Sequence, residues 1–129
     1  MEGISTGQLW AGRILSAIAV AFLLFDATGK LARVEPVVTG TVELGYREQS
    51  VVTIGVLLLV GVVLYVVPRT SLVGAVYLAA YLGGAVATHF RVGNPLASHV
   101  LFPVYVALFL WVGLALRNPR LLAVVTGAT

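Results

Sequence analysis

The sequence contains no cysteine and few charged residues, and both shortages narrow what the chain can be. Without cysteine it forms no disulfide and offers no thiolate to a metal, a cluster or a redox reaction. Eight Lys or Arg and five Asp or Glu occur among 129 residues, of which 60% are hydrophobic. So little polar surface cannot cover the core of a soluble domain of this length. The mean hydropathy of +1.04 agrees, and we expect one small domain in a lipid bilayer.

Other features are missing as well. The N-terminus, MEGISTGQLWAGR, lacks the basic start and the small-residue cleavage site of a secretory signal, so we expect the first apolar segment to be retained. There is no nucleotide fingerprint, no phosphate-binding loop and no nucleophile beside an evident base, so we do not expect a complete enzyme. The net charge of +3 comes from arginines spread over loops and helix ends, which argues against a nucleic-acid partner.

Four apolar segments are long enough, or nearly so, to cross a bilayer as helices. They cover residues 9–31, 50–67, 71–89 and 95–116. We therefore predict an all-α integral membrane protein, a four-helix transmembrane bundle that forms a single domain over residues 1–129. Asn94 is expected to cap the fourth helix, with Pro95 at its first position.

The segment PVVTGTVELGY, residues 36–46, lies between the first and second of these helices. Its valines and leucine fall on one arc, which predicts a short amphipathic helix on the membrane surface. The alternative is an unstructured loop.

Four helices place both termini on one side of the membrane. Each side then holds four basic residues, so the positive-inside rule does not decide the orientation. We place both termini in the cytoplasm and the protein in a bacterial inner membrane.

The third predicted helix carries small residues at a spacing of four: Ala75, Ala79, Gly83 and Ala87. Close backbone approach at small residues is how helices pack in lipid, so this stripe predicts packing within the bundle. A homodimer interface is the alternative.

Asp26 is the unusual residue of the first helix. Residues 14–25, between it and Arg13, carry no charge and span roughly 18 Å as a helix, against about 30 Å of hydrocarbon. Arginine can extend to its interface but aspartate cannot, so Asp26 is expected below the membrane surface, facing protein or a wet cavity. Lys30 lies one turn later on the same face. It either contributes to a site or simply neutralises Asp26 and anchors the helix end.

The remaining polar residues are predicted at the same end of the bundle as Asp26. They are Thr88, His89, Arg91, Asn94 and His99, with Glu43 and Tyr46 from the surface segment. The other end has little beyond boundary arginines. Pro103 removes the hydrogen bond to the His99 carbonyl and is expected to kink that turn. Tyr77 and Tyr81 lead towards the cluster along one helix face, and either line a pocket or pack in the core. The other candidates for a pocket lining are Thr88, Glu43, Tyr46 and Pro103.

Several chemistries suit this cluster. His89 or His99 could donate a proton to a quinone or another carbonyl ligand. A haem, or a metal held with Asp26, is disfavoured because neither histidine lies in a ligand-spaced motif. The plainest alternative is a hydrogen-bonded lock that ties the first, third and fourth helices together.

The sequence resembles the DoxX-like family of small membrane proteins. The resemblance rests on ILSAIAVAFLLFDATGKL (14–31), ELGY (43–46), VLYVVPRT (63–70) and YLGGAVATHFRVGNPLASHVLFPVYVALFLWVGLALRNPRL (81–121). It implies a four-helix transmembrane bundle, and its polar positions fall on Asp26, Lys30, His89, Arg91, Pro95 and His99. The family is named after a membrane subunit of a quinone-linked oxidoreductase, and a related branch assists receptor assembly.

Two functions follow as hypotheses. In the first, a pocket at one membrane face binds a lipid-soluble, quinone-like molecule, and the protein serves a redox partner as an oxidoreductase subunit. In the second, it is a non-enzymatic assembly or interaction protein whose polar cluster braces the bundle.

Overall fold

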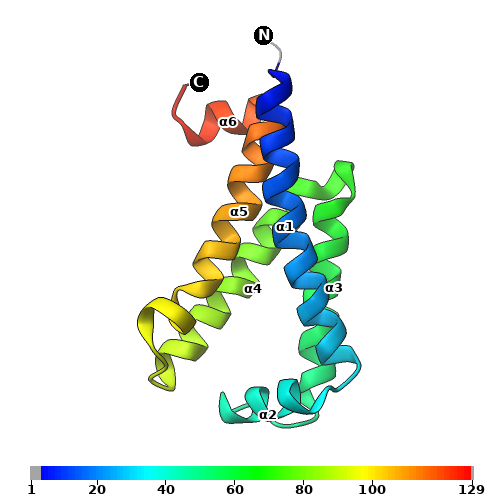
Figure 1. Ribbon diagram of the computed structural model, residues 1–129, viewed down its shortest axis with the longest axis vertical. Coiled ribbons are helices and arrows are strands. Elements are labelled where there is room, and N and C mark those ends of the chain that lie inside the picture. The colour runs from blue at the N-terminus through cyan, green and yellow to red at the C-terminus, as the bar shows by residue number, and fades with distance from the viewer. Residues whose placement is uncertain (1–3, 129) are drawn as a thin grey trace.

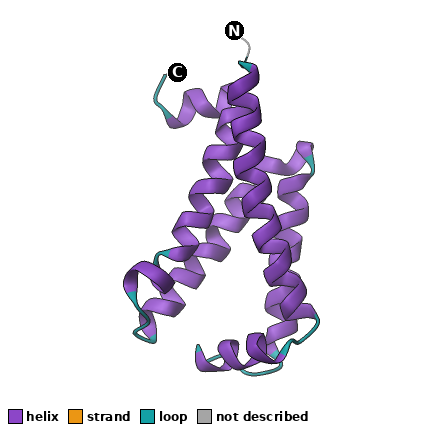
Figure 2. Ribbon diagram, in the orientation of Figure 1, coloured by secondary structure: helices purple, strands orange, loops and turns teal. Residues whose placement is uncertain are grey.

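The computed structural model describes residues 4–128, and these form helices without a strand. Short turns and loops join the helices (Figure 2). In chain order the elements are α1 (Thr6–Leu31), α2 (Glu35–Glu43), α3 (Ser50–Val66), the 3₁₀ turn η1 (Pro68–Thr70), α4 (Ser71–Arg91), the π-helical turn η2 (Leu96–Val100), α5 (Phe102–Arg117) and α6 (Pro119–Val125).

Three segments are long and apolar enough to cross a membrane: Thr6–Leu31, Pro68–Arg91 and Leu96–Arg117. The helix Ser50–Val66 is also apolar but shorter. Large hydrophobic side chains such as Phe25, Val73 and Leu108 are exposed along these helices, as expected where lipid replaces water around the protein.

The four long helices α1, α3, α4 and α5 pack around a shared core. Helix α1 contacts α5 and α3, and α4 contacts the same two helices. Leu23, Leu58, Leu78 and Leu110, one from each helix, are fully buried where they meet. Both termini lie at one end, with α6 beside the C-terminus, while α2 lies across the opposite end (Figure 1). Towards α2, the pair α4 and α5 diverges from the pair α1 and α3 (Figure 1).

Glycines set the closest helix contacts. A Cβ atom on Gly12 would lie 2.7 Å from the Gly113 carbonyl oxygen, so α1 and α5 touch backbone to backbone there. A Cβ on Gly74 would overlap the backbone of Tyr65, which fixes α4 against α3. These two contacts lie in the half of the molecule away from α2.

The predicted small-residue stripe on α4 is wrong in its second half. Ala75 is buried and Ala79 half-buried, but Gly83 and Ala87 are exposed. A spacing of four residues advances about 40° beyond a full helical turn at each step. Gly74, Leu78 and Leu82, which are also four apart, occupy the middle of the buried face. The predicted stripe begins at Ala75 on the edge of that face, so its later members turn away from the core.

The fourth predicted helix is divided into two. The π-helical turn Leu96–Val100 is followed by a break at Leu101, and α5 begins at Phe102 with Pro103 in its first turn. The distortion expected near His99 is therefore present. The capping role assigned to Asn94 is wrong, because its side chain hydrogen-bonds His89 instead.

The end of the bundle near the termini holds a buried polar network that the sequence analysis missed. The Tyr65 hydroxyl donates to the Leu110 carbonyl at 2.6 Å and lies 2.8 Å from Ser16 Oγ. Arg117 donates to Ser16 Oγ at 3.0 Å and to the Gly113 carbonyl at 3.2 Å. These bonds join α1, α3 and α5, and we call Ser16, Tyr65 and Arg117 the interhelical lock.

Candidate functional site

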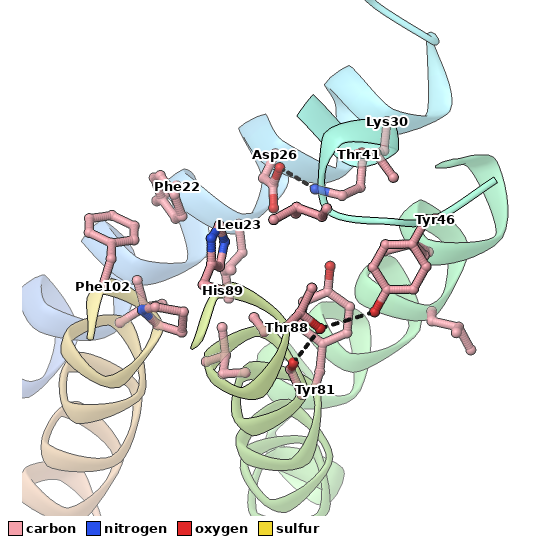
Figure 3. Close-up of a pocket in the computed structure, with 18 residues that line it drawn as sticks. Phe22, Leu23, Asp26, Lys30, Thr41, Tyr46, Tyr81, Thr88, His89 and Phe102 are labelled. Atoms are coloured by element: carbon pink, nitrogen blue, oxygen red, sulfur yellow. Dashed lines mark hydrogen bonds and ion pairs between the residues drawn. The ribbon is translucent and has the colours of Figure 1, made fainter. Parts of the chain in front are cut away.

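A cavity of about 480 Å³ opens between the diverging helices at the α2 end of the molecule (Figure 3). Its walls come from α1, α3, α4 and α5, and the segment of α2 and its following loop covers it. Apolar side chains such as Leu23, Ile54, Leu57, Leu82 and Val106 make up most of the lining. A volume of this size and a mainly apolar wall are typical of small-molecule sites.

Phe22 and Phe102 form an aromatic edge of this cavity on α1 and α5. Their rings meet edge to face with centroids 5.1 Å apart. Each side chain is 40% exposed, so this edge lies at the protein's outer, lipid-facing surface.

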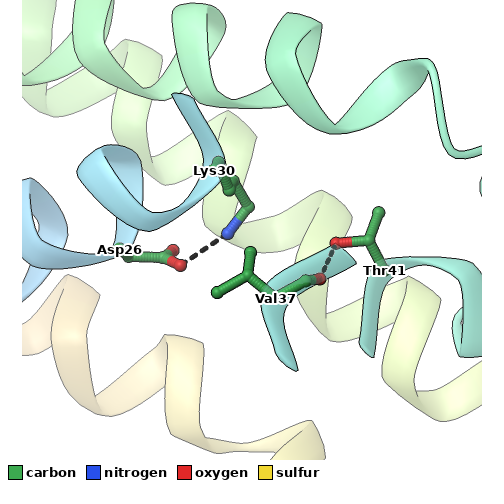
Figure 4. A network of polar contacts seen from close by, with 4 residues as sticks. All are labelled: Asp26, Lys30, Val37 and Thr41. Atoms are coloured by element: carbon green, nitrogen blue, oxygen red, sulfur yellow. Dashed lines mark hydrogen bonds and ion pairs between the residues drawn. The ribbon is translucent and has the colours of Figure 1, made fainter. Parts of the chain in front are cut away.

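Asp26 and Lys30 form an ion pair in the wall contributed by α1 (Figure 4). Lys30 Nζ lies 2.5 Å from Asp26 Oδ1, and the side chains are 14% and 30% exposed respectively. Gly55 of α3 makes room for the lysine, since a Cβ there would lie 2.8 Å from Lys30 Cβ. Burial of either charge alone would be costly, and pairing compensates for part of that cost.

The two tyrosines expected in a pocket on α4 have different positions. Tyr81 lines the cavity, and its hydroxyl makes no hydrogen bond to the other residues drawn in Figure 3. Tyr77 lies one turn away, outside the cavity lining, and its hydroxyl donates to the Leu57 carbonyl at 2.7 Å. Of the two alternatives for these residues, Tyr77 packs against the core and Tyr81 lines the cavity.

The histidines lie together at the rim. His89 lines the cavity, and its ring centroid is 5.9 Å from that of His99. Asn94 Nδ2 is 2.7 Å from His89 Nδ1, and Ser98 Oγ is 2.8 Å from His99 Nδ1. A second hollow of about 370 Å³ contains Asp26, Lys30, Glu43, His89, Asn94 and His99 in its lining. Because both hollows share Asp26, Lys30 and His89, the polar end of the cavity continues to the rim.

The loop after α2 is fastened to the end of α4 by two side chains. The Tyr46 hydroxyl lies 3.2 Å from Thr88 Oγ1, and Arg91 donates to the Leu44 carbonyl at 2.6 Å. Gly45 between them has φ +98°, and a Cβ there would meet the Arg91 guanidinium at 2.8 Å. Arg91 therefore holds the cover of the cavity in place and does not line either hollow.

Comparison with known proteins identifies the family. A model of the DoxX-like family matches residues 14–113, which is most of the chain and includes most of α1, all of α2 to α4 and most of α5. The chain belongs to the DoxX-like family. No curated protein and no solved structure matches it. Family membership and the three long apolar helices together indicate that this DoxX-like chain is an integral membrane protein.

The polar cluster of this DoxX-like protein contains bonds of two kinds. Asp26 with Lys30, His89 with Asn94, and Ser98 with His99 are near neighbours in sequence, whereas Tyr46 with Thr88 and Arg91 with Leu44 fasten the loop after α2 to α4. The bonds that join α1, α3 and α5 belong to Ser16, Tyr65 and Arg117 at the other end. Asp26, Lys30, Tyr81 and His89 line the cavity, as the few polar groups of a small-molecule site do.

Several lining residues were not anticipated from the sequence. Thr41 is buried and lines both hollows, although its hydroxyl is used within α2 as a donor to the Val37 carbonyl (Figure 4). Phe22, Phe102 and Gly84 also line the cavity. Their residue types are ordinary for a membrane helix, so only the rotation of each helix reveals them. Among residues 4–128 no three acidic, histidine or cysteine side chains are arranged to hold a metal ion.

Proposed function

We propose that this DoxX-like protein binds a lipid-soluble small molecule with a carbonyl-bearing head group, such as a quinone, in the cavity at the α2 end. The observation that carries the proposal is the composition of that cavity, whose apolar walls lead to a polar end with unused hydrogen-bonding groups. Such a site matches a ligand that has an apolar body and a polar head. The redox assignment is further supported by the resemblance to a family named after a quinone-linked enzyme subunit.

The polar groups have distinct roles in this proposal. Tyr81 and Lys30 donate hydrogen bonds to the carbonyl oxygens of the head group, because both line the cavity and carry N–H or O–H donors. Asp26 holds Lys30 charged and oriented. His89 lies at the boundary of the two hollows, where it can pass a proton between the ligand and the rim.

The proposal also includes the membrane arrangement. Helix α3 would cross the bilayer as the fourth segment of a transmembrane bundle, since it packs between α1 and α4. Helix α2 would lie at the membrane surface over the cavity. The protein would serve a redox partner in a bacterial inner membrane, with both termini in the cytoplasm.

The second function hypothesis, a brace for assembly with other proteins, receives less support from the geometry. A brace needs bonds between distant helices, and the Asp26–Lys30 pair stays within α1, whereas the interhelical lock joins α1, α3 and α5. The two hypotheses differ in what mutation of the cluster changes, which is ligand affinity in one and folding stability in the other.

The direct test replaces Tyr81 with phenylalanine and measures binding of a short-chain alkyl benzoquinone to the purified protein in mild detergent. Loss of one hydrogen bond is expected to weaken binding about 2- to 12-fold, since such a bond contributes roughly 0.5–1.5 kcal/mol. Tyr77→Phe is the matched control, because it removes the same atom from the same helix outside the cavity. Native mass spectrometry of the untreated protein would show the mass of a co-purified ligand. Equal binding by the wild-type protein and both variants would contradict the proposal.

A further inference from the structure

A separate cleft lies at the opposite end of the molecule, next to the interhelical lock. It has a volume of about 240 Å³ and is bounded by α1, α3 and the end of α5. Two arginines, Arg13 and Arg117, line it together with Ser16 and Tyr65. It shares no lining residue with the cavity at the α2 end.

Arg117 is held rigidly at this cleft with part of its hydrogen-bonding capacity unused. Its aliphatic stem packs over Gly12, where a Cβ atom would lie 2.7 Å from Arg117 Cγ. Its Nε donates to the Gly113 carbonyl and one Nη2 proton to Ser16. A guanidinium has five donors, so others remain for a ligand. A planar donor group fixed in this way is suited to a phosphate.

The chain supplies no carboxylate to this end within the described residues. The four acidic residues that the structure describes are Asp26, Glu35, Glu43 and Glu48, all in or near α2 or the end of α1. The two ion pairs found in residues 4–128, Asp26 with Lys30 and Arg33 with Glu48, are also there. No carboxylate of residues 4–128 therefore pairs with Arg13 or Arg117, and the phosphate of an anionic lipid would complement their charge.

The cleft changes from cationic to apolar along its length. Arg13 is followed on the same face of α1 by Ala17 and Val20, which line the deeper part with Val66 of α3. Trp10 lies beside Arg13, with the guanidinium carbon 5.1 Å from its ring centroid, and is exposed. Tryptophan is typical of the membrane interface. The polar part of the cleft would therefore lie at head-group depth and the apolar part among acyl chains.

We propose that this cleft binds one anionic phospholipid, with the phosphate between Arg13 and Arg117 and an acyl chain along Ala17, Val20 and Val66. Basic pockets between membrane helices recognise lipid phosphates in this way. Because Arg117 also belongs to the interhelical lock, the bound lipid would stabilise the junction of α1, α3 and α5.

The test uses the full chain, delipidated in a non-ionic detergent, and phosphatidylglycerol as the probe. Binding is measured by native mass spectrometry and by the rise in unfolding temperature, with phosphatidylcholine and inorganic phosphate titrated separately. We expect phosphatidylglycerol to bind more tightly than phosphatidylcholine, and Arg13→Gln to weaken it about fivefold. Arg120→Gln, which removes an exposed arginine outside the cleft lining, should bind like the wild type.

A second variant guards against an indirect effect of charge removal. Ala17→Phe places a ring in the cleft without changing the charge, and should also lose phosphatidylglycerol. Ala21→Phe, one turn along α1 and outside the cleft lining, should retain it. The proposal is overturned if phosphatidylcholine binds equally well, if Arg13→Gln and Ala17→Phe leave binding unchanged, or if inorganic phosphate alone gives the full stabilisation.

Discussion

Replacing Tyr65 with phenylalanine removes one oxygen atom from the centre of the interhelical lock. That oxygen is 2.6 Å from the Leu110 carbonyl and 2.8 Å from Ser16 Oγ, and the residue is 2% exposed. Two hydrogen bonds are lost, each worth roughly 0.5–1.5 kcal/mol in general and about 0.6 on average between membrane helices. Ser16 keeps the bond from Arg117, so the loss of unfolding free energy should be roughly 1–2 kcal/mol.

Equilibrium unfolding in detergent micelles measures this change. Tyr81→Phe is the appropriate comparison, because the Tyr81 hydroxyl bonds to none of the residues drawn around the cavity. It should change the unfolding free energy by less than about 0.5 kcal/mol. Tyr65→Phe should in turn leave quinone binding unchanged, since Tyr65 does not line the cavity at the α2 end. An undiminished stability of Tyr65→Phe, or an equal loss in Tyr81→Phe, would refute the division of the molecule into a lock and a site.

Two further substitutions test whether the residues that stabilise the bundle are separate from those that line the ligand site. Asp26→Asn leaves the Lys30 ammonium, whose side chain is 14% exposed, without its carboxylate partner. It should therefore weaken quinone binding and also lower the unfolding free energy, as measured by titration and unfolding of the same preparation. Lowered stability with unchanged quinone binding would favour the brace hypothesis instead. Gly74→Val should destabilise by about 1–3 kcal/mol or prevent folding, because its side chain would overlap the backbone of Tyr65; Gly83→Val, which meets open space, is the control.

Much of the helical layout could be predicted from the sequence, because the boundaries are marked by strong local signals. Pro68 ends the second apolar segment, and the structure has α3 over Ser50–Val66 against the predicted 50–67. The distortion near His99 follows from Pro103, which has no N–H to donate. Helix α6 was missed, since its seven residues, which begin with Pro119, are too few to produce a periodic signal.

The predicted capping role of Asn94 was wrong because its side chain has a local partner instead. An asparagine before a proline is a common helix start, and Asn94 was interpreted in this way. In the structure the chain folds back so that Asn94 meets His89, five residues earlier, and their side chains bond. Asparagine side chains often choose such local partners over a cap, and the choice depends on a turn that the sequence does not specify.

The interhelical lock escaped prediction for a different reason. Ser16, Tyr65 and Arg117 are 49 or more residues apart, and each is unremarkable in its own segment. Whether they meet depends on the rotation and register of three helices, which one sequence does not encode in any local pattern. The same holds for Thr41, Phe22 and Phe102 around the cavity. Asp26 was found because a charge in an apolar segment is conspicuous wherever the helix points.

The central claim is that the cavity at the α2 end binds a ligand, and two adjacent glycines of α4 allow it to be tested by filling that cavity. Gly84 lines it and Gly83 does not, and a Cβ on either would meet nothing within 4 Å. The measurement is the affinity of a short-chain alkyl benzoquinone for Gly84→Leu and Gly83→Leu in the same detergent. The account predicts that Gly84→Leu loses binding while Gly83→Leu binds like the wild type. Equal binding by both variants would contradict it.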